Sequence, residues 1–221
     1  MSSDFARSVA PGTVASSTEA AIARATAQFE RMDPGAAAGT LEPALRAAPV
    51  SVDGWNLMAR LRLALDENQA ALEAANKAIA LAPDNARALA TASRALSLLG
   101  RHDDAVTMAY RAVVVEPKNP LWHDRVAWAL LAAERQFADA EQAARTAIGL
   151  DPEEPHYYFT HGAALEALGH TDQARQALLT SLRMEPENPM AQHRLAVLNG
   201  EATREPTPKK RGFRLFGRKK T

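Results

Sequence analysis

The feature that most constrains this chain is a proline that returns about every 34 residues. The recurring residues are Pro49, Pro83, Pro117, Pro152 and Pro186, at successive spacings of 34, 34, 35 and 34 residues. Between two such prolines lie two amphipathic stretches of about 14 residues joined by a short turn, most clearly over 86–119. Proline ends a helix because it lacks an N–H donor and clashes with the preceding turn. A helix–turn–helix unit with this period predicts an all-α solenoid.

The prolines divide the chain into units that we number as repeats. We expect a disordered N-terminal tail (1–17), a degenerate first helical pair (18–51), a repeat domain (52–199), and a linker with a basic C-terminal tail (200–221). The repeat domain comprises repeat 1 (52–85), repeat 2 (86–119), repeat 3 (120–154), repeat 4 (155–188) and a closing helix (189–199). In the first pair, one helix begins at Thr18 and the other runs over roughly 39–48. A terminal unit departs from the pattern because one of its sides faces water.

Composition supports closely packed helices. The chain has 48 alanines but only 12 aromatic residues, so small side chains supply much of its 47% hydrophobic content. The alternating β-branched pattern of strands is absent from the sequence.

Local signals place the helix ends. Asp84 and Asn85 offer side-chain oxygens to cap the next helix, and Pro120, Pro155 and Pro189 each suit the first turn of a helix. Gly100 allows a left-handed turn after the first helix of repeat 2. Repeat 3 is one residue longer, and we expect the extra residue in the turn at 133–138, which has no glycine.

Small residues recur at three positions of each repeat. They are Ala59, Ser93, Ala127 and Gly162 at position 8; Ala71, Ala105, Ala140 and Ala174 at position 20; and Ala78, Ala112, Ala147 and Ser181 at position 27. Small residues are needed where paired helices approach to about 8–10 Å. In this pattern residues 52–199 resemble the tetratricopeptide repeat family, with a weaker match from Thr18. Position 24, commonly aromatic in that family, holds Ala75, Ala109, Ala144 and Leu178 here, which predicts a thinner core.

The resemblance implies a right-handed superhelical solenoid whose first helices line a concave groove for a peptide or a partner helix. The implied function is a non-catalytic scaffold or adaptor with a protein partner. The family's groove positions fall on Asn56, Arg60, Leu63, Arg87, Arg94, Ser97, Leu121, Asp124, Trp128, His156, Phe159, Glu166 and His193. Trp128 and Phe159 are candidate aromatic anchors. The alternative for Trp128 is that it only packs against a neighbouring helix. The family's carboxylate clamp is matched by Asn56 and Arg60 alone, so that ligand is not predicted.

The sequence offers no catalytic or metal-binding motif. It contains no cysteine, no HExxH pair, no GxxxxGK[ST] loop and no serine nucleophile elbow. His161 occupies an interior position, where we expect a hydrogen-bonded core histidine and not a ligand. We therefore predict no enzyme activity, cofactor or metal site.

Net charge of zero hides an asymmetry. Residues 205–221 contain seven basic residues and one acidic residue, whereas the remainder has 19 basic and 25 acidic residues. The tail combines Lys209, Lys210, Arg211, Arg214, Arg218, Lys219 and Lys220 with Phe213, Leu215 and Phe216. Such a segment suits an anionic membrane surface. It also suits nucleic acid, whose phosphates and bases the same side chains would contact. A solubilising tail, a short motif read by another protein, or contact with the acidic body are further alternatives.

Hydropathy predicts a cytoplasmic protein. The N-terminal residues lack the apolar run of a signal peptide, and the longest apolar run, 126–133, is far shorter than the roughly 20 residues that span a bilayer. If the tail binds lipid, we expect peripheral association with the inner face of the membrane.

Overall fold

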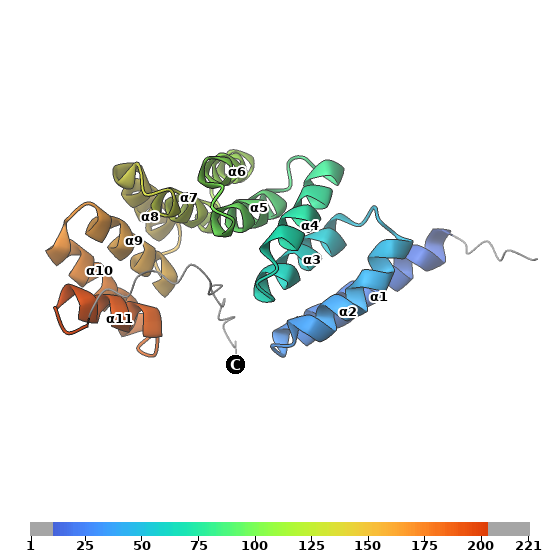
Figure 1. The fold of residues 1–221 in the computed structure, drawn as a ribbon, viewed down its shortest axis with the longest axis horizontal. Coiled ribbons are helices and arrows are strands. Elements are labelled where there is room, and N and C mark those ends of the chain that lie inside the picture. The colour runs from blue at the N-terminus through green and yellow to red at the C-terminus, as the bar shows by residue number, and fades with distance from the viewer. Residues whose placement is uncertain (1–10, 203–221) are drawn as a thin grey trace, which may run out of the picture. The chain divides into compact units, whose positions relative to one another are not determined.

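The computed structural model describes residues 11–202, in which every regular element is an α-helix (Figure 1). The helices are α1 (Pro11–Glu30), α2 (Pro34–Ala47), α3 (Val52–Ala64), α4 (Asn68–Leu81), α5 (Ala86–Leu98), α6 (His102–Val115), α7 (Pro120–Ala132), α8 (Phe137–Leu150), α9 (Pro155–Ala167), α10 (Thr171–Met184) and α11 (Pro189–Leu198). Repeats 1 to 4 are thus the pairs α3–α4, α5–α6, α7–α8 and α9–α10, and α11 is the closing helix. The all-α repeat architecture predicted from the proline period is confirmed.

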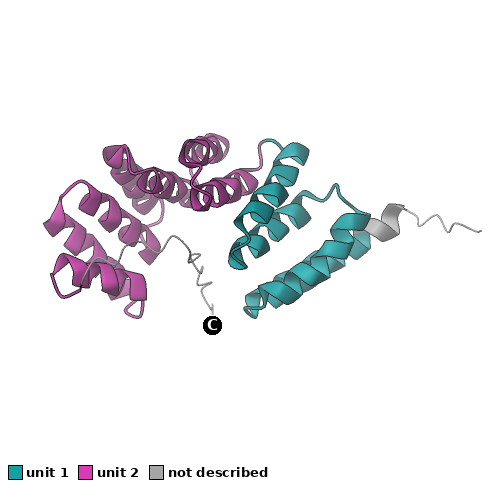
Figure 2. Ribbon diagram, in the orientation of Figure 1, with its two compact units in different colours: residues 1–83, 212–221 teal, residues 84–211 magenta. Residues whose placement is uncertain are grey.

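The chain divides into two compact units (Figure 2). Within the described residues, unit 1 comprises residues 11–83 and unit 2 comprises residues 84–202. The division falls after Pro83, between repeats 1 and 2, which the sequence prediction placed in one domain.

Unit 1 is built from two antiparallel helix pairs. α1 packs against α2, α3 packs against α4, and α3 also contacts both helices of the first pair. Leu41 and Leu45 of α2 and Leu61 of α3 are at most 2% exposed. Gly54 lies where α3 meets α2, because a Cβ at this position would lie 2.6 Å from Cδ2 of Leu45. A larger residue at position 54 would require the side chain of Leu45 to shift.

Unit 2 repeats one packing scheme along the chain. Each first helix packs against the second helix of its own repeat, α7 and α9 also pack against the second helix of the preceding repeat, and the successive first helices α5, α7 and α9 are neighbours. The apolar cluster between α6, α7 and α8 includes Val106, Val126 and Leu130. Burying side chains of this size contributes about 1.5–3 kcal/mol each.

The small residues at positions 8, 20 and 27 are buried where helices meet in unit 2. Ser93, Ala127, Ala105, Ala140, Ala174, Ala112, Ala147 and Ser181 are all 0% exposed. In repeat 4, a Cβ added to Gly162 would lie 3.0 Å from Cγ of Leu178. The hydroxyl of Ser181 is satisfied locally, since it donates a 2.8 Å hydrogen bond to the carbonyl oxygen of Pro155. These contacts explain why position 8 and its partners stay small.

The predicted helix caps and turns of unit 2 are confirmed. Oδ1 of Asn85 accepts a 2.9 Å hydrogen bond from the N–H of Ala88, and prolines begin α7, α9 and α11. Gly100 has φ of +76°, the left-handed conformation expected of it. In the longer turn of repeat 3, Glu134 and Gln136 take positive φ values of 51° and 52°. The extra residue therefore lies where it was predicted, without a glycine to ease it.

The N-terminal helices differ from the predicted boundaries. α1 begins at Pro11, so residues 11–17, predicted to be disordered, are helical. α2 begins at Pro34 and not near residue 39, because Asp33 caps it by accepting a 2.9 Å hydrogen bond from the N–H of Ala36. An acidic residue followed by proline ends the preceding helix, and the same pair is also a strong start for the next one.

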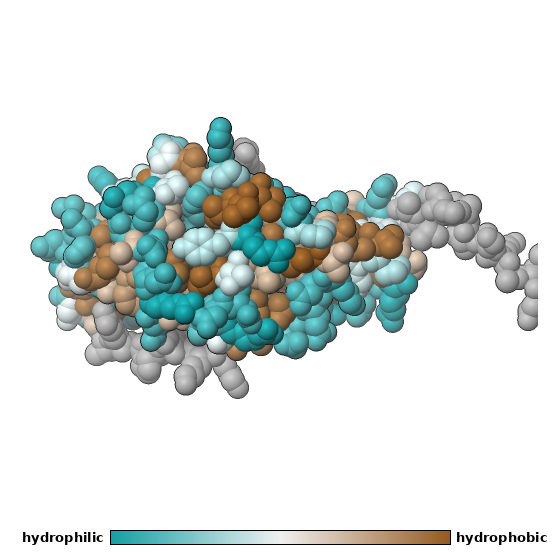
Figure 3. Space-filling view, turned by 90° about the horizontal axis from the view of Figure 1, so that it is seen from above, coloured by the Kyte–Doolittle hydropathy of each residue, from teal (hydrophilic) through white to brown (hydrophobic). Residues whose placement is uncertain are grey.

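The surface mixes apolar and polar side chains. On the face seen in Figure 3, hydrophobic residues lie interspersed among hydrophilic ones. Val114 of α6, at 79%, and Leu121 of α7, at 54%, are among the more exposed large hydrophobic residues. None of the helices in the described range is both long and apolar enough to cross a membrane.

Candidate functional site

Three rings gather where the first helices of repeats 3 and 4 meet. Trp128 comes from the third turn of α7, while His156 and Phe159 come from the first turns of α9. The ring centroid of Trp128 lies 6.0 Å from that of His156 and 5.9 Å from that of Phe159. We call these three residues the aromatic cluster. Trp128 and His156 are partly exposed, whereas Phe159 is only 3% exposed.

A hydrogen-bonded network joins the cluster to a buried carboxylate. Nε1 of Trp128 donates to Nε2 of His156 at 3.1 Å, and Oδ2 of Asp124 lies 3.5 Å from the same nitrogen. Thr160 donates to the other oxygen of Asp124 at 2.6 Å. Asp124 is 4% exposed, so these partners satisfy a carboxylate that has little access to water.

The shared nitrogen gives His156 two alternative states. A neutral imidazole with its proton on Nδ1 accepts the Trp128 hydrogen bond at Nε2, whereas a protonated Nε2 is drawn to Asp124. Burial by itself would lower the pKa of His156. The charge of Asp124 and its hydrogen bond outweigh burial, so this pKa is raised above its usual value. The cluster therefore couples the indole of Trp128 to the charge of a histidine.

A second group of charges borders the cluster on the side of the closing helix. The guanidinium of Arg194, on α11, lies 5.6 Å from the ring centroid of Phe159. Nε of Arg194 also lies 3.4 Å from Oε2 of Glu166. Phe159 packs with Leu178 and Ala191 behind it. Phe159 is therefore enclosed by helices α9, α10 and α11, while cation and carboxylate lie above it.

Comparison with known families settles the class of this chain. The family model described as tetratricopeptide repeat matches residues 22–86, 56–120 and 125–189, which together cover most of the chain. The chain belongs to the tetratricopeptide repeat family. The predicted resemblance is confirmed.

Solved tetratricopeptide structures share its fold. TTC0263, a tetratricopeptide protein of Thermus thermophilus, superposes with a TM-score of 0.71 at 19% identity, covering 82% of this chain and 98% of that one. PilF of Pseudomonas aeruginosa superposes with a TM-score of 0.69 at 20% identity, covering 86% and 87% respectively. At these identities the likeness shows the fold alone.

A curated relative matches a shorter stretch. Anaphase-promoting complex subunit 3 of Dictyostelium discoideum is 31% identical over 85 residues, which are 38% of this chain. The match spans only 9% of the length of that relative.

The structure distributes the thirteen predicted groove residues over both units. Asn56, Arg60 and Leu63 belong to unit 1, where Asn56 and Leu63 are buried and Arg60 lies over the ring of Phe29 at 5.4 Å. In unit 2 the structure brings together Asp124, Trp128, His156 and Phe159, and Glu166 approaches them through Arg194. The remaining predicted residues of unit 2 are Arg87, Leu121 and His193, which are exposed, and Arg94 and Ser97, which are half-buried.

Two residues of the site fall outside the predicted set. Thr160 lies beside the groove position of Phe159, and Arg194 lies beside that of His193. The sequence carries no signal for Thr160, because its partner Asp124 lies 36 residues earlier in the chain on another helix. The predicted tail residues lie outside the described range. No group of three or more histidine, aspartate or glutamate side chains within residues 11–202 could hold a metal ion.

Proposed function

We propose that this tetratricopeptide chain is a non-catalytic scaffold whose unit 2 binds a peptide or helix of a protein partner on its first helices. The observation that carries this proposal is the aromatic cluster. Trp128 and His156 offer partly exposed rings beside a paired cation and carboxylate, which is the composition of interface hot spots. Trp128 does pack against α9, and that packing holds its ring in one orientation for a partner.

Within the cluster, Phe159 supports the other rings and Trp128 contacts the partner. Phe159 is too deeply buried to contact a partner and supports Trp128 from below. The indole of Trp128 is partly exposed while its Nε1 donates to His156, and this exposed part is the contact surface. Large, rigid aromatic side chains supply contact area at a small entropic cost.

Site-specific photo-crosslinking tests where the partner binds. A photoreactive phenylalanine at His193 occupies an exposed position of the closing helix equivalent to that of Phe159. The same residue at Val114, on the second helix α6, is the matched control. We expect partner adducts from position 193 and not from position 114. Equal yields at both positions would contradict a site on the first helices.

Two tryptophans of α7 provide a matched pair of variants. Trp128→Leu removes the indole of the cluster, while Trp122→Leu removes one that donates to Glu116 at 2.7 Å outside it. Loss of a hot-spot aromatic weakens binding by at least about 2 kcal/mol. We therefore expect Trp128→Leu to reduce the yield of crosslinking and Trp122→Leu to leave it unchanged. Circular dichroism should show that both variants are folded. An undiminished crosslinking yield from Trp128→Leu would show that the aromatic cluster is not part of the interface.

For the basic tail we propose binding to an anionic membrane surface. Its support is the sequence of residues 205–221, in which seven basic residues surround Phe213, Leu215 and Phe216. Each basic residue near such a surface contributes about 1 kcal/mol, and aromatic side chains insert at the interface. Flotation with phosphatidylserine vesicles should recover the full chain and lose a chain ending at residue 208. A variant with all three apolar residues changed to alanine should float less than the full chain. Salt-sensitive oligonucleotide binding without flotation would support nucleic acid instead.

A further inference from the structure

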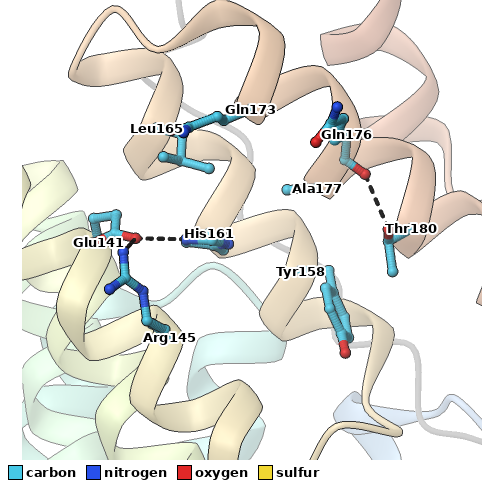
Figure 4. A pocket seen from close by; sticks show the side chains of 9 residues that line it. All are labelled: Glu141, Arg145, Tyr158, His161, Leu165, Gln173, Gln176, Ala177 and Thr180. Carbon is cyan, nitrogen blue, oxygen red and sulfur yellow. Dashed lines mark hydrogen bonds and ion pairs between the residues drawn. The ribbon is translucent and has the colours of Figure 1, made fainter.

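A pocket of about 330 Å³ opens among the helices of repeats 3 and 4 (Figure 4), and no residue of the aromatic cluster lines it. Glu141 and Arg145 of α8 line one side of it, and Gln176 of α10 lies on the other side. His161 of α9 points across to Glu141, with Nε2 2.8 Å from Oε1. None of these residues was predicted as a groove position.

The junction of repeats 3 and 4, where this pocket lies, is polar at positions that are apolar at the junction of repeats 2 and 3. Glu141 and His161 occupy the positions held by Val106 and Val126 in the preceding repeats, 35 residues earlier in each case. Those valines are 8% and 3% exposed and belong to one apolar cluster. Replacing a buried ion pair by apolar residues is often neutral or stabilising, so stability alone does not account for the polar pair. The Glu141–His161 pair therefore indicates a role in binding at the pocket.

The donors that line the pocket indicate the charge of a ligand. Oε1 of Glu141 is contacted by both His161 and Arg145, so the charge of this carboxylate is already matched. The side chain of Arg145 is 61% exposed and its guanidinium carries further N–H groups, and Gln176, on α10 at the other side of the pocket, supplies an amide. Leu165 and Ala177 add apolar surface to the same lining. Cationic and amide donors above an apolar floor suit a carboxylate that is attached to an apolar group.

We propose that this pocket binds an acidic side chain, flanked by aliphatic residues, from a segment of a protein partner. Arg145 donates to its carboxylate, Gln176 donates from the opposite wall, and the aliphatic neighbours contact Leu165 and Ala177. Glu141 and His161 act as positioning residues, because they hold Arg145 at the edge of the pocket. This site is separate from the surface of first helices and would let unit 2 contact partner segments on two faces.

Binding is tested on the isotope-labelled full chain with a pair of peptides that differ in one group. The probes are acetyl-Ala-Leu-Glu-Leu-Ala-amide and its glutamine counterpart, followed by amide shifts of α8, α9 and α10 in NMR spectra. We expect saturable shifts with the glutamate peptide and about tenfold weaker binding of the glutamine peptide, the ratio set by one charge-assisted hydrogen bond. Equal affinity for the two peptides would overturn the proposal. Equal shifts with free acetate would show that the pocket binds any carboxylate and does not recognise a peptide.

Variants separate the site from its structural background. Arg145→Gln should weaken binding of the glutamate peptide about tenfold, whereas Arg101→Gln, an equal charge change at an exposed arginine of another repeat, should leave it unchanged. Glu141→Val with His161→Val restores the apolar pair of the preceding interface. We expect that double variant to fold and to lose the peptide-induced shifts. Native affinity in either pocket variant would overturn the proposal, and neither result bears on crosslinking at position 193.

Discussion

Two successive junctions of unit 2 are built from the same positions with opposite chemistry. At the junction of repeats 2 and 3, Val106 of repeat 2 and Val126 of repeat 3 belong to one apolar cluster, and Ala90 of repeat 2 occupies the position equivalent to Asp124. Between repeats 3 and 4, the same positions hold Asp124, Glu141 and His161, each hydrogen-bonded or ion-paired. Both junctions nevertheless bring a first helix against the preceding pair in the same way. The backbone packing is therefore set by the small residues, and the chemistry of the junction can vary around it.

This difference separates the parts of unit 2 that stabilise the fold from the parts available for binding. An apolar junction gains from burial, whereas a polar one loses that gain and must satisfy every donor and acceptor. The polar junction is also where both candidate sites lie, the aromatic cluster on the first helices and the pocket beside the second helices. We interpret the junction of repeats 3 and 4 as the functional segment of the unit.

The largest effect is expected from placing a charge in the apolar junction. Val106→Glu places a carboxylate in the apolar cluster that Val106 forms with Val126. Burial of an unpaired charge should reduce the free energy of unfolding by about 3 kcal/mol. Adding Val126→His should recover part of this loss by recreating the polar pair. Urea unfolding followed by circular dichroism measures both effects. If Val106→Glu leaves the free energy of unfolding unchanged, the valine junction is accessible to water.

The reverse exchange should stabilise the protein. In Glu141→Val with His161→Val, the junction of repeats 3 and 4 acquires the valine pair of its neighbour. Removing a partly buried ion pair in favour of apolar residues is expected to raise the free energy of unfolding by about 1–2 kcal/mol. The same urea experiment measures it. A loss of stability instead would show that the polar pair is present for folding and would weaken the argument for a ligand.

A matched pair of threonines tests the buried network. Thr160 and Thr91 occupy the same position of their repeats, but only Thr160 reaches a carboxylate, since Thr91 donates to the carbonyl of Arg87 in its own helix. Thr160→Val should reduce the free energy of unfolding by about 1.5 kcal/mol, because it deprives buried Asp124 of a donor. Thr91→Val should change it by less than about 0.5 kcal/mol. Similar losses in the two variants would indicate that the threonine methyl groups matter more than the network.

The sequence predicted the part of this comparison that periodicity controls. Prolines and small residues such as Ala127 and Gly162 mark where helices end and touch, and both follow from backbone geometry that every repeat shares. The departures were harder to predict, because Glu141 looks like a solvated helix residue until the neighbouring repeat is placed over it. His161 was correctly expected to be hydrogen-bonded, but its partner lies 20 residues away on another helix. The start of α1 was missed because residues 11–17 carry no apolar periodicity.

Acid should affect the polar junction selectively. Burial alone would raise the pKa of Glu141, but the hydrogen bonds and charges of His161 and Arg145 outweigh it and lower this pKa. A lowered pKa means that the stabilisation is present above the usual value of about 4.5 and is lost as pH falls through the folded-state pKa. We expect Glu141→Gln to flatten this acid limb in thermal melts between pH 3 and 6. An unchanged acid limb would assign it to other carboxylates.

The smallest expected effect lies on the other side of the same junction, at neutral pH. Because the pKa of His156 is raised, its stabilising contact with Asp124 is fully present below about pH 6.5 and is lost as pH rises through the folded-state pKa. The native chain should therefore gain stability over His156→Gln as pH falls from 8.5 to 5.5. Asp124→Asn should lower the pKa of His156, read from its imidazole proton resonances, because burial then acts without the opposing charge. If that resonance titrates identically with and without Asp124, the carboxylate and the ring are not coupled, and the aromatic cluster responds to pH no more than the valine junction does.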